Sequence, residues 1–211
     1  RFPCPLSRCI LALMSKAMTD RTRSGVTLAG PFMAAMLSLG IYLANGRTIG
    51  SGDTTGPALI PVSILACGTV DLSQFAPVLA PPGMLPYYLH ASRGGVWSVY
   101  SMAPGILVTP LYAIPVWKYG QVRRTPREWL DKALEWQKYS ASIITALSAG
   151  VFFSLILAMG GSQASATALT IAYAFGSQAW SVSSQALWQH GPAVLALLAA
   201  ISAAIWFRNK P

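Results

Sequence analysis

The carboxylate of Asp53 is the side chain in this sequence that is best placed for chemistry. It stands in the run GSGDTTG at positions 50–56, where every neighbour is small. Such a run lets the backbone turn tightly and bring an acid close to a ligand. A positioned carboxylate can deprotonate a hydroxyl or hold a divalent cation that screens a phosphate. We therefore predict that Asp53, on a flexible loop, is a catalytic base or a metal ligand; the alternative is an ordinary solvated turn.

A second group of polar side chains lies between Tyr87 and Tyr100, where aromatic residues are interspersed with His90 and Arg93. Histidine and arginine can both donate hydrogen bonds to a phosphate. The same pattern is typical of an aromatic belt at a membrane interface, with an arginine that extends towards water. Phosphate contact and interfacial anchoring therefore both stay open for His90 and Arg93. The other histidine, His190, lies in the polar and aromatic run SVSSQALWQHGP at positions 181–192.

Other sequence motifs give no further site. The chain has no HExxH, P-loop, GxGxxG or GxSxG pattern, and its two histidines do not assemble a nucleophilic triad by spacing. The three cysteines, Cys4, Cys9 and Cys67, match neither a zinc pattern nor a disulfide framework. We therefore expect no structural metal and no disulfide scaffold.

The composition is that of an integral membrane protein. Of the 211 residues, 54% are hydrophobic and only 10% are charged, whereas soluble domains carry roughly 25% charged residues. The net charge of +9 is interpreted as topology and contact with membrane lipids, because no nucleic-acid motif accompanies it. Nucleic acid is therefore not expected as a partner.

Five apolar segments predict an all-α fold, a polytopic transmembrane bundle in a single membrane domain, 1–211. Each is about long enough to cross the ~30 Å hydrocarbon layer of a bilayer. The expected spans are residues 26–44, 99–117, 140–159, 164–182 and 192–207.

The long first loop, 45–98, is expected to carry interfacial helices. Its apolar stretch 57–70 is interrupted by Pro61 and Gly68 and is too short to span, so we expect a helix that lies along the membrane surface. Four prolines in 76–86 predict an extended connector.

The segment 118–139 predicts an amphipathic helix that begins at Pro126. Trp129 and Trp136 fall on one face, which we expect to lie on the membrane surface, and Glu128 is spaced to pair with Lys132.

Positive charge predicts which segments face the cytoplasm. Residues 1–25 and 118–139 are both basic, which is typical of cytoplasmic segments, and the loop 45–98 would then be external. Strict alternation, however, places 188–190 inside and the basic tail at Arg208 outside, against the same rule. The side of His190 therefore stays open.

Taken together, these features resemble the GT-C superfamily of polytopic membrane glycosyltransferases. The resemblance covers nearly the whole chain and rests on the first span, Gly52-Asp53, the interfacial helix, the aromatic belt, MAPGILVTPLYAIPV at Met102–Val116, and YAFGSQAWSVSSQALWQHGP at Tyr173–Pro192. GT-C enzymes are usually longer, so the chain resembles an N-terminal part or a reduced relative.

The resemblance implies glycosyl transfer from a polyprenyl-phosphate-linked sugar to an acceptor. Asp53, in the first external loop, would be the essential base or a ligand of Mg²⁺ or Mn²⁺. His90, Arg93 and His190 would contact the donor phosphate. The expected location is the bacterial inner membrane.

Two other classes of function compete with this interpretation. The first is a non-catalytic subunit that packs into and stabilises a larger membrane complex, using the small residues of 164–182 as its interface. The second is a transporter, which is disfavoured because no predicted span carries a buried charge of the sort that marks a substrate path.

Overall fold

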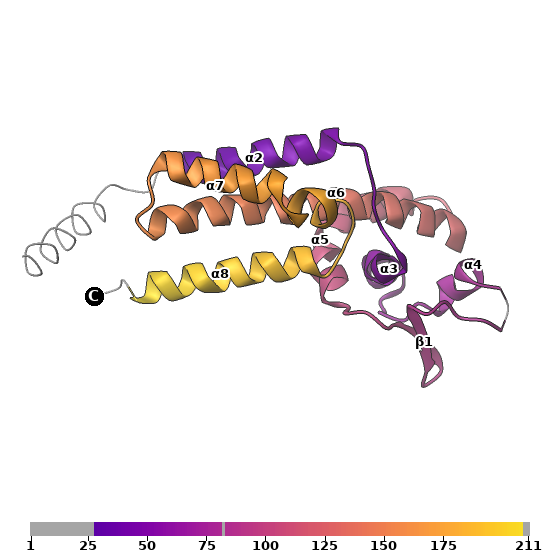
Figure 1. The fold of residues 1–211 in the computed structure, drawn as a ribbon. Helices are drawn as coiled ribbons and strands as arrows, with labels where there is room; N and C mark the ends of the chain where they lie inside the picture. The colour runs from indigo at the N-terminus through magenta and orange to yellow at the C-terminus, as the bar shows by residue number, and fades with distance from the viewer. Residues whose placement is uncertain (1–27, 82, 209–211) are drawn as a thin grey trace, which may run out of the picture.

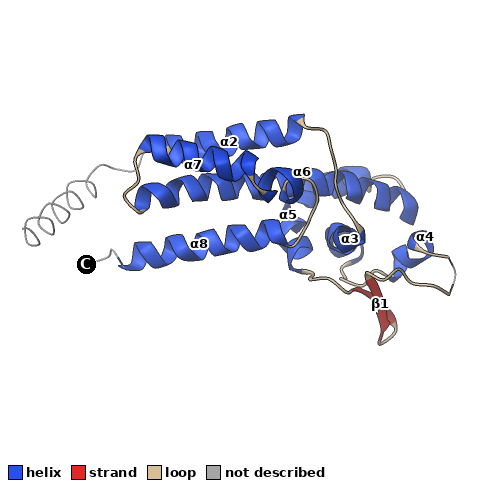
Figure 2. Cartoon of the chain, in the orientation of Figure 1, coloured by secondary structure: helices blue, strands red, loops and turns tan. Residues whose placement is uncertain are grey.

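The computed structural model describes residues 28–81 and 83–208, which form a mostly helical protein (Figure 2). The predicted cytoplasmic segment 1–25 and the first two residues of the predicted span 26–44 lie outside the described residues. The elements, in chain order, are α2 (Ala29–Ala44), α3 (Gly52–Cys67), η1 (Ser73–Phe75, a 3₁₀ turn), α4 (Ala76–Leu79), β1 (Leu89–Ser92), β2 (Gly95–Ser98), α5 (Ala103–Tyr119), α6 (Pro126–Ala158), α7 (Gln163–Gly176), η2 (Ala179–Ser183, a π-helix) and α8 (His190–Arg208).

Helices α2, α7 and α8 lie alongside the C-terminal half of α6 and form a bundle (Figure 1). The contact between α2 and α6 is close, because a Cβ atom on Gly150 would lie 2.9 Å from the Pro31 carbonyl oxygen. At the other end of α2, the buried Tyr42 hydroxyl donates a 2.9 Å hydrogen bond to the Ala174 carbonyl of α7. Helix α6 is thus the central element of the bundle.

The number of long apolar helices differs from the sequence-based expectation. Within the described residues, α6 and α8 are long and apolar enough to cross a membrane, and α2 is a shorter apolar helix. The expected span 164–182 is divided, because Ser177 takes an extended conformation after α7 and η2 follows it. Five spans are therefore a prediction that the structure does not show.

Helix α6 joins two elements that were expected to be separate. Thr125 and Glu128 form a capping box at its start, with 2.8 Å between the Thr125 nitrogen and a Glu128 carboxylate oxygen. The predicted pair of Glu128 with Lys132 is wrong: Glu128 pairs with Arg124, and Lys132 pairs with Glu135. The charged side chains all lie in the N-terminal part, so residues 139–158 form an uncharged helical stretch.

The N-terminal part of α6 packs against α3 and α5 in the main hydrophobic core. Buried members of this core include Leu59 of α3, Tyr112 of α5 and Ala133 of α6. The Tyr112 hydroxyl donates a 3.2 Å hydrogen bond to the Ala133 carbonyl, and the Tyr112 ring contacts Trp136 edge to face. The apolar face with Trp129 and Trp136 therefore packs on the protein core, which corrects the prediction that it lies on a membrane.

The stretch around Asp53 was expected to be a loop, and the structure instead starts α3 at Gly52. Its middle, from Thr54 to Ser63, is buried within the protein, so this helix is not the surface-lying element predicted for 57–70. Pro57 and Pro61 lack an N–H group and leave the carbonyls of Asp53 and Pro57 without their usual helical partners. The Pro57 carbonyl is where α5 makes its close approach, at Gly105.

We expect Gly105→Ala to destabilise the fold, because the added Cβ atom would lie 2.6 Å from the Pro57 carbonyl oxygen and 2.9 Å from Cβ of Ile60. Overpacking of this kind costs about 1–3 kcal/mol. The matched control is Gly176→Ala, where no atom lies within 4 Å of the added Cβ. Unfolding in a mild detergent measures both. Equal stability of the two variants would contradict the close contact of α3 with α5.

The connector and the aromatic belt also contain regular structure. Helix α4 forms a single turn from Ala76, where Pro77 is tolerated because the first turn needs no N–H donor. The aromatic belt contains a two-stranded hairpin in which Leu89 pairs with Ser98 and Ser92 with Gly95. The all-α prediction is therefore correct for the main architecture and missed this hairpin.

Two segments that were predicted to lie on opposite sides of a membrane pack against each other. A cavity of about 210 Å³ is lined by Cys67 and Gln74, from the predicted external loop, and by Arg124 and Trp129, from the predicted cytoplasmic segment. Segments that line one cavity cannot be separated by a hydrocarbon layer of ~30 Å. The assignment of 118–139 and 45–98 to opposite sides is therefore incompatible with this packing.

Candidate functional site

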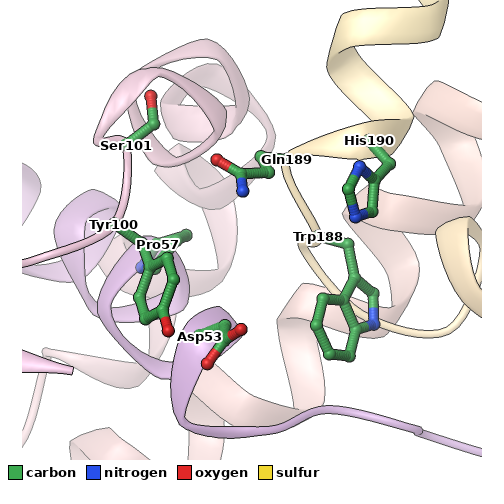
Figure 3. Close-up of a pocket in the computed structure, with 7 residues that line it drawn as sticks. All are labelled: Asp53, Pro57, Tyr100, Ser101, Trp188, Gln189 and His190. Carbon is green, nitrogen blue, oxygen red and sulfur yellow. The ribbon is translucent and has the colours of Figure 1, made fainter. Parts of the chain in front are cut away.

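A small pocket brings together three parts of the chain that are far apart in the sequence (Figure 3). Its volume is about 40 Å³, enough for a few water molecules or the reacting end of a larger substrate. Asp53 and Tyr100 lie on one side, and Trp188 and His190 lie on the other. The lining residues are Asp53, Pro57, Tyr100, Ser101, Trp188, Gln189 and His190.

The start of α3 fixes the position of Asp53. Ser51 is the N-cap, and its hydroxyl oxygen accepts a 3.2 Å hydrogen bond from the Asp53 backbone nitrogen. In return, the Thr54 hydroxyl oxygen accepts a 3.2 Å hydrogen bond from the Ser51 nitrogen. Asp53 thus lies in the first helical turn, where the helix dipole favours a negative charge.

Among the described residues, two tyrosines and no basic side chain interact with the Asp53 carboxylate. The Tyr87 hydroxyl donates a 2.9 Å hydrogen bond to Oδ1 of Asp53, and this bond raises the pKa of Tyr87 above its ordinary value. Desolvation, followed by hydrogen bonding to Asp53, also raises the pKa of Tyr100. Both hydroxyls therefore stay protonated donors. The ion pairs in the described part of the chain all lie between Arg124 and Glu135, so the Asp53 charge is not neutralised by one of them.

Glycine at position 52 makes this arrangement possible. A Cβ atom there would overlap the ring of Tyr88 and would lie 2.8 Å from the Tyr87 hydroxyl oxygen. Gly56, one turn further along α3, likewise leaves room for the Ser98 side chain of β2. The small residues around Asp53 therefore allow close packing, and the predicted flexible loop is wrong.

The opposite wall of the pocket is the segment before α8. The Trp188 indole nitrogen donates a 3.0 Å hydrogen bond to the Ile49 carbonyl, just before α3. This bond joins the two walls of the pocket through residues that are 139 positions apart in the sequence. His190 is the first residue of α8 and is exposed, so its imidazole is available to a ligand at the mouth of the pocket.

The structure does not bring His90 and Arg93 into this pocket. His90 lies in β1 opposite Trp97, and its side chain is exposed. Arg93 forms the hairpin turn with Gly94; their φ angles are 51° and 78°, which is typical of a two-residue type I′ turn. Their role in binding a donor phosphate stays a prediction.

The residues of the pocket do not form a protein cage for a metal ion. In the ranges 28–81 and 83–208 no group of three or more His, Cys, Asp or Glu side chains is close enough to share one. Asp53 could supply one carboxylate to Mg²⁺ or Mn²⁺, since Mg²⁺ is often held by one or two carboxylates together with substrate phosphates and water. The metal role of Asp53 therefore stays a prediction that depends on the substrate.

Several residues of this site were not identified from the sequence. Tyr87 and Tyr100 were noted only as members of the aromatic belt, Trp188 only as part of the polar and aromatic run 181–192, and Gln189 was not singled out. A usable signal was Ser51 with Thr54, the spacing of a capping box, which marks the start of a helix at Asp53.

A comparison with protein-family models, curated protein sequences and solved structures finds no match for this chain. The class of protein that the structure defines is therefore a mostly helical protein with two helices long and apolar enough to cross a membrane. Its function has to be inferred from the site.

Proposed function

We propose that this protein is a GT-C-like membrane glycosyltransferase, or the part of one that carries the catalytic acid. The observation that supports the proposal most is that Asp53 and His190, both predicted site residues, line the same pocket. A pocket lined by the carboxylate of Asp53, the side chain of Tyr100 and the exposed imidazole of His190 suits proton removal beside a phosphate.

In the proposed reaction, the Asp53 carboxylate takes the proton of an acceptor hydroxyl. The acceptor oxygen forms a bond to C1 of the sugar while the bond from C1 to the phosphate oxygen breaks, and polyprenyl phosphate leaves. Tyr87 donates a hydrogen bond to Oδ1 of Asp53 and holds the carboxylate in place while it receives the proton. His190 contacts the departing phosphate, with a divalent cation at Asp53 if the reaction requires one.

We also propose a membrane arrangement that places the N-terminal segment and the Arg208 tail on the same side, although it leaves the basic segment 118–139 outside, against the positive-inside rule. Helix α2 starts and α8 ends at the same end of the bundle (Figure 1). In the sequence, Arg21 and Arg23 precede α2, and Arg208 is the last residue of α8. By the positive-inside rule this end faces the cytoplasm. The pocket, at the opposite end, faces outwards together with α3, α5 and the charged part of α6.

Cysteine labelling tests this arrangement. In a chain whose native cysteines are replaced by serine, we expect cysteines at the exposed positions Thr48 and Val122 to react with an impermeant maleimide in intact cells. A cysteine at Met159, which is exposed at the end of α6, should react only after permeabilisation. Different labelling of Thr48 and Val122 would contradict the arrangement, and so would labelling of Met159 from outside.

The proposed activity is tested with the full-length protein in lipid nanodiscs and a panel of polyprenyl-phosphate-linked sugars. We expect protein-dependent release of polyprenyl phosphate from at least one donor. Loss of release on addition of EDTA, with recovery in Mg²⁺ or Mn²⁺, would support the metal role of Asp53; unchanged release would leave Asp53 as a base alone. If no donor is consumed and the chain co-purifies with other membrane proteins, the non-catalytic subunit becomes the better interpretation.

A further inference from the structure

Lys138 is a charged side chain in an unusual position. It lies on α6, only 6% of its surface is exposed, and among the described residues it is the only buried charged side chain. No carboxylate pairs with it within ion-pair distance in that part of the chain. A buried ammonium group without compensation is costly, so its partners explain why the position tolerates a lysine. Lys138 lies just before the predicted span 140–159, in the segment that was assigned to the cytoplasm, so the expectation that no predicted span carries a buried charge did not cover it.

The partners of Lys138 belong to the segment that leads into the pocket. Its Nζ donates a 3.1 Å hydrogen bond to the Ser184 carbonyl and a 2.9 Å hydrogen bond to Oε1 of Gln185. Ser184 is the C-cap of the π-helix η2. The C-terminal end of a helix carries a partial negative charge and favours a cation. The end of η2 and the Gln185 amide thus compensate the ammonium in place of a carboxylate.

Neighbouring side chains of α6 hold the same segment. The Ser142 hydroxyl donates a 3.0 Å hydrogen bond to the Ser184 carbonyl, which therefore accepts from both Ser142 and Lys138. Oε1 of Gln137 accepts a 3.4 Å hydrogen bond from the Leu187 nitrogen. The next residues along the chain, Trp188 to His190, line the pocket.

We propose that Lys138 is a positioning residue that fixes the 184–187 segment, so that Trp188 and His190 face Asp53 across the pocket. It acts through the Ser184 carbonyl and the Gln185 side chain and does not itself line the pocket. The catalytic consequence rests on the proposed function, whereas the structural consequence, a loss of order in 188–190, does not.

A spin label at position 189 separates these two consequences. Gln189 is exposed, so a cysteine there can be labelled in the full-length protein in nanodiscs after the native cysteines are replaced. We expect Lys138→Met to increase the mobility of this label, while a label at Val122 keeps its mobility. Lys138→Arg, which retains a cation at the end of η2, should restore most of the order. The matched control is Lys132→Met, which removes a half-exposed lysine from the same helix.

The second measurement is the rate of glycosyl transfer by the same variants. We expect Lys138→Met to lower kcat by roughly 10–10²-fold, the scale expected for a misplaced reacting group, with KM changed much less. If Lys138→Met does not fold, Gln185→Leu removes a partner from the other side of the contact and is expected to mobilise the same label. An unchanged label at 189 in a folded Lys138→Met or Gln185→Leu protein would overturn the positioning role. If the wild type is inactive, the label still decides this role, and only the proposed function fails.

Discussion

Replacing Asp53 by asparagine is expected to lower glycosyl transfer by about 10²–10⁴-fold, the usual contribution of a positioned general base. Asparagine keeps the volume and can still accept the hydrogen bond from Tyr87, but it cannot take a proton from the acceptor. The free energy of unfolding should fall by about 1 kcal/mol or less. The substitution removes only the charge on one hydrogen-bond acceptor and the favourable interaction of that charge with the start of α3. Initial rates and thermal unfolding in the same nanodiscs measure the two effects.

Asp131→Asn is the matched control for this substitution. Asp131 is an exposed acid on α6 that pairs with Arg127 at the surface, and exposed ion pairs contribute little to stability. We expect its transfer rate to equal that of the wild type. Transfer by Asp53→Asn at the wild-type rate would show that Asp53 is not the base.

Gly52→Ala is expected to lower transfer by about 10²-fold without removing any functional group. The added Cβ atom would overlap the Tyr88 ring and lie 2.8 Å from the Tyr87 hydroxyl oxygen. Tyr88 packs against the main core, so the start of α3 has to move instead, and Asp53 moves with it. Misplacement of a reacting group by about 1 Å can cost this much in rate.

Gly40→Ala controls for a general effect of replacing a helical glycine. Gly40 lies in α2, and no atom is within 4 Å of the Cβ atom that would be added. We expect full activity and unchanged or slightly increased stability. If Gly52→Ala retains full activity, the contact of Tyr87 and Tyr88 with the start of α3 does not position Asp53.

Composition and periodicity predicted the helical architecture. They did not predict how the helices pack against one another. Pro57 and Pro61 predicted an interrupted interfacial stretch, yet they lie inside α3 because α5 packs closely on the carbonyl that Pro61 leaves free. This contact is between residues far apart in the sequence, and a sequence window does not contain it. The joining of two predicted elements into α6 was missed for a different reason. The change from charged to uncharged residues near Lys138 was interpreted as the boundary between a cytoplasmic segment, 118–139, and a membrane span, 140–159, whereas one helix runs through both.

The site was predictable in part. Asp53 and His190 were identified from residue type and from the GT-C resemblance, and the structure places both in one pocket. His90 and Arg93 were chosen for their charge, but the positive φ angle of Arg93 shows that this residue forms a hairpin turn. Tyr87 belongs to the site because it contacts Asp53, which lies 34 positions away in the sequence. Lys138 belongs to it because it contacts Gln185, which lies 47 positions away. Neither contact is evident from a single sequence.

A double-mutant cycle with Asp53→Asn and His190→Ala tests the central claim most directly, because two groups that act on one transition state lose rate in a non-additive way. We predict that each single variant reduces transfer and that the double variant is much less impaired than the product of the two single losses. A double variant whose loss equals that product, or a His190→Ala protein with wild-type transfer, would contradict the account in which the two residues serve one site.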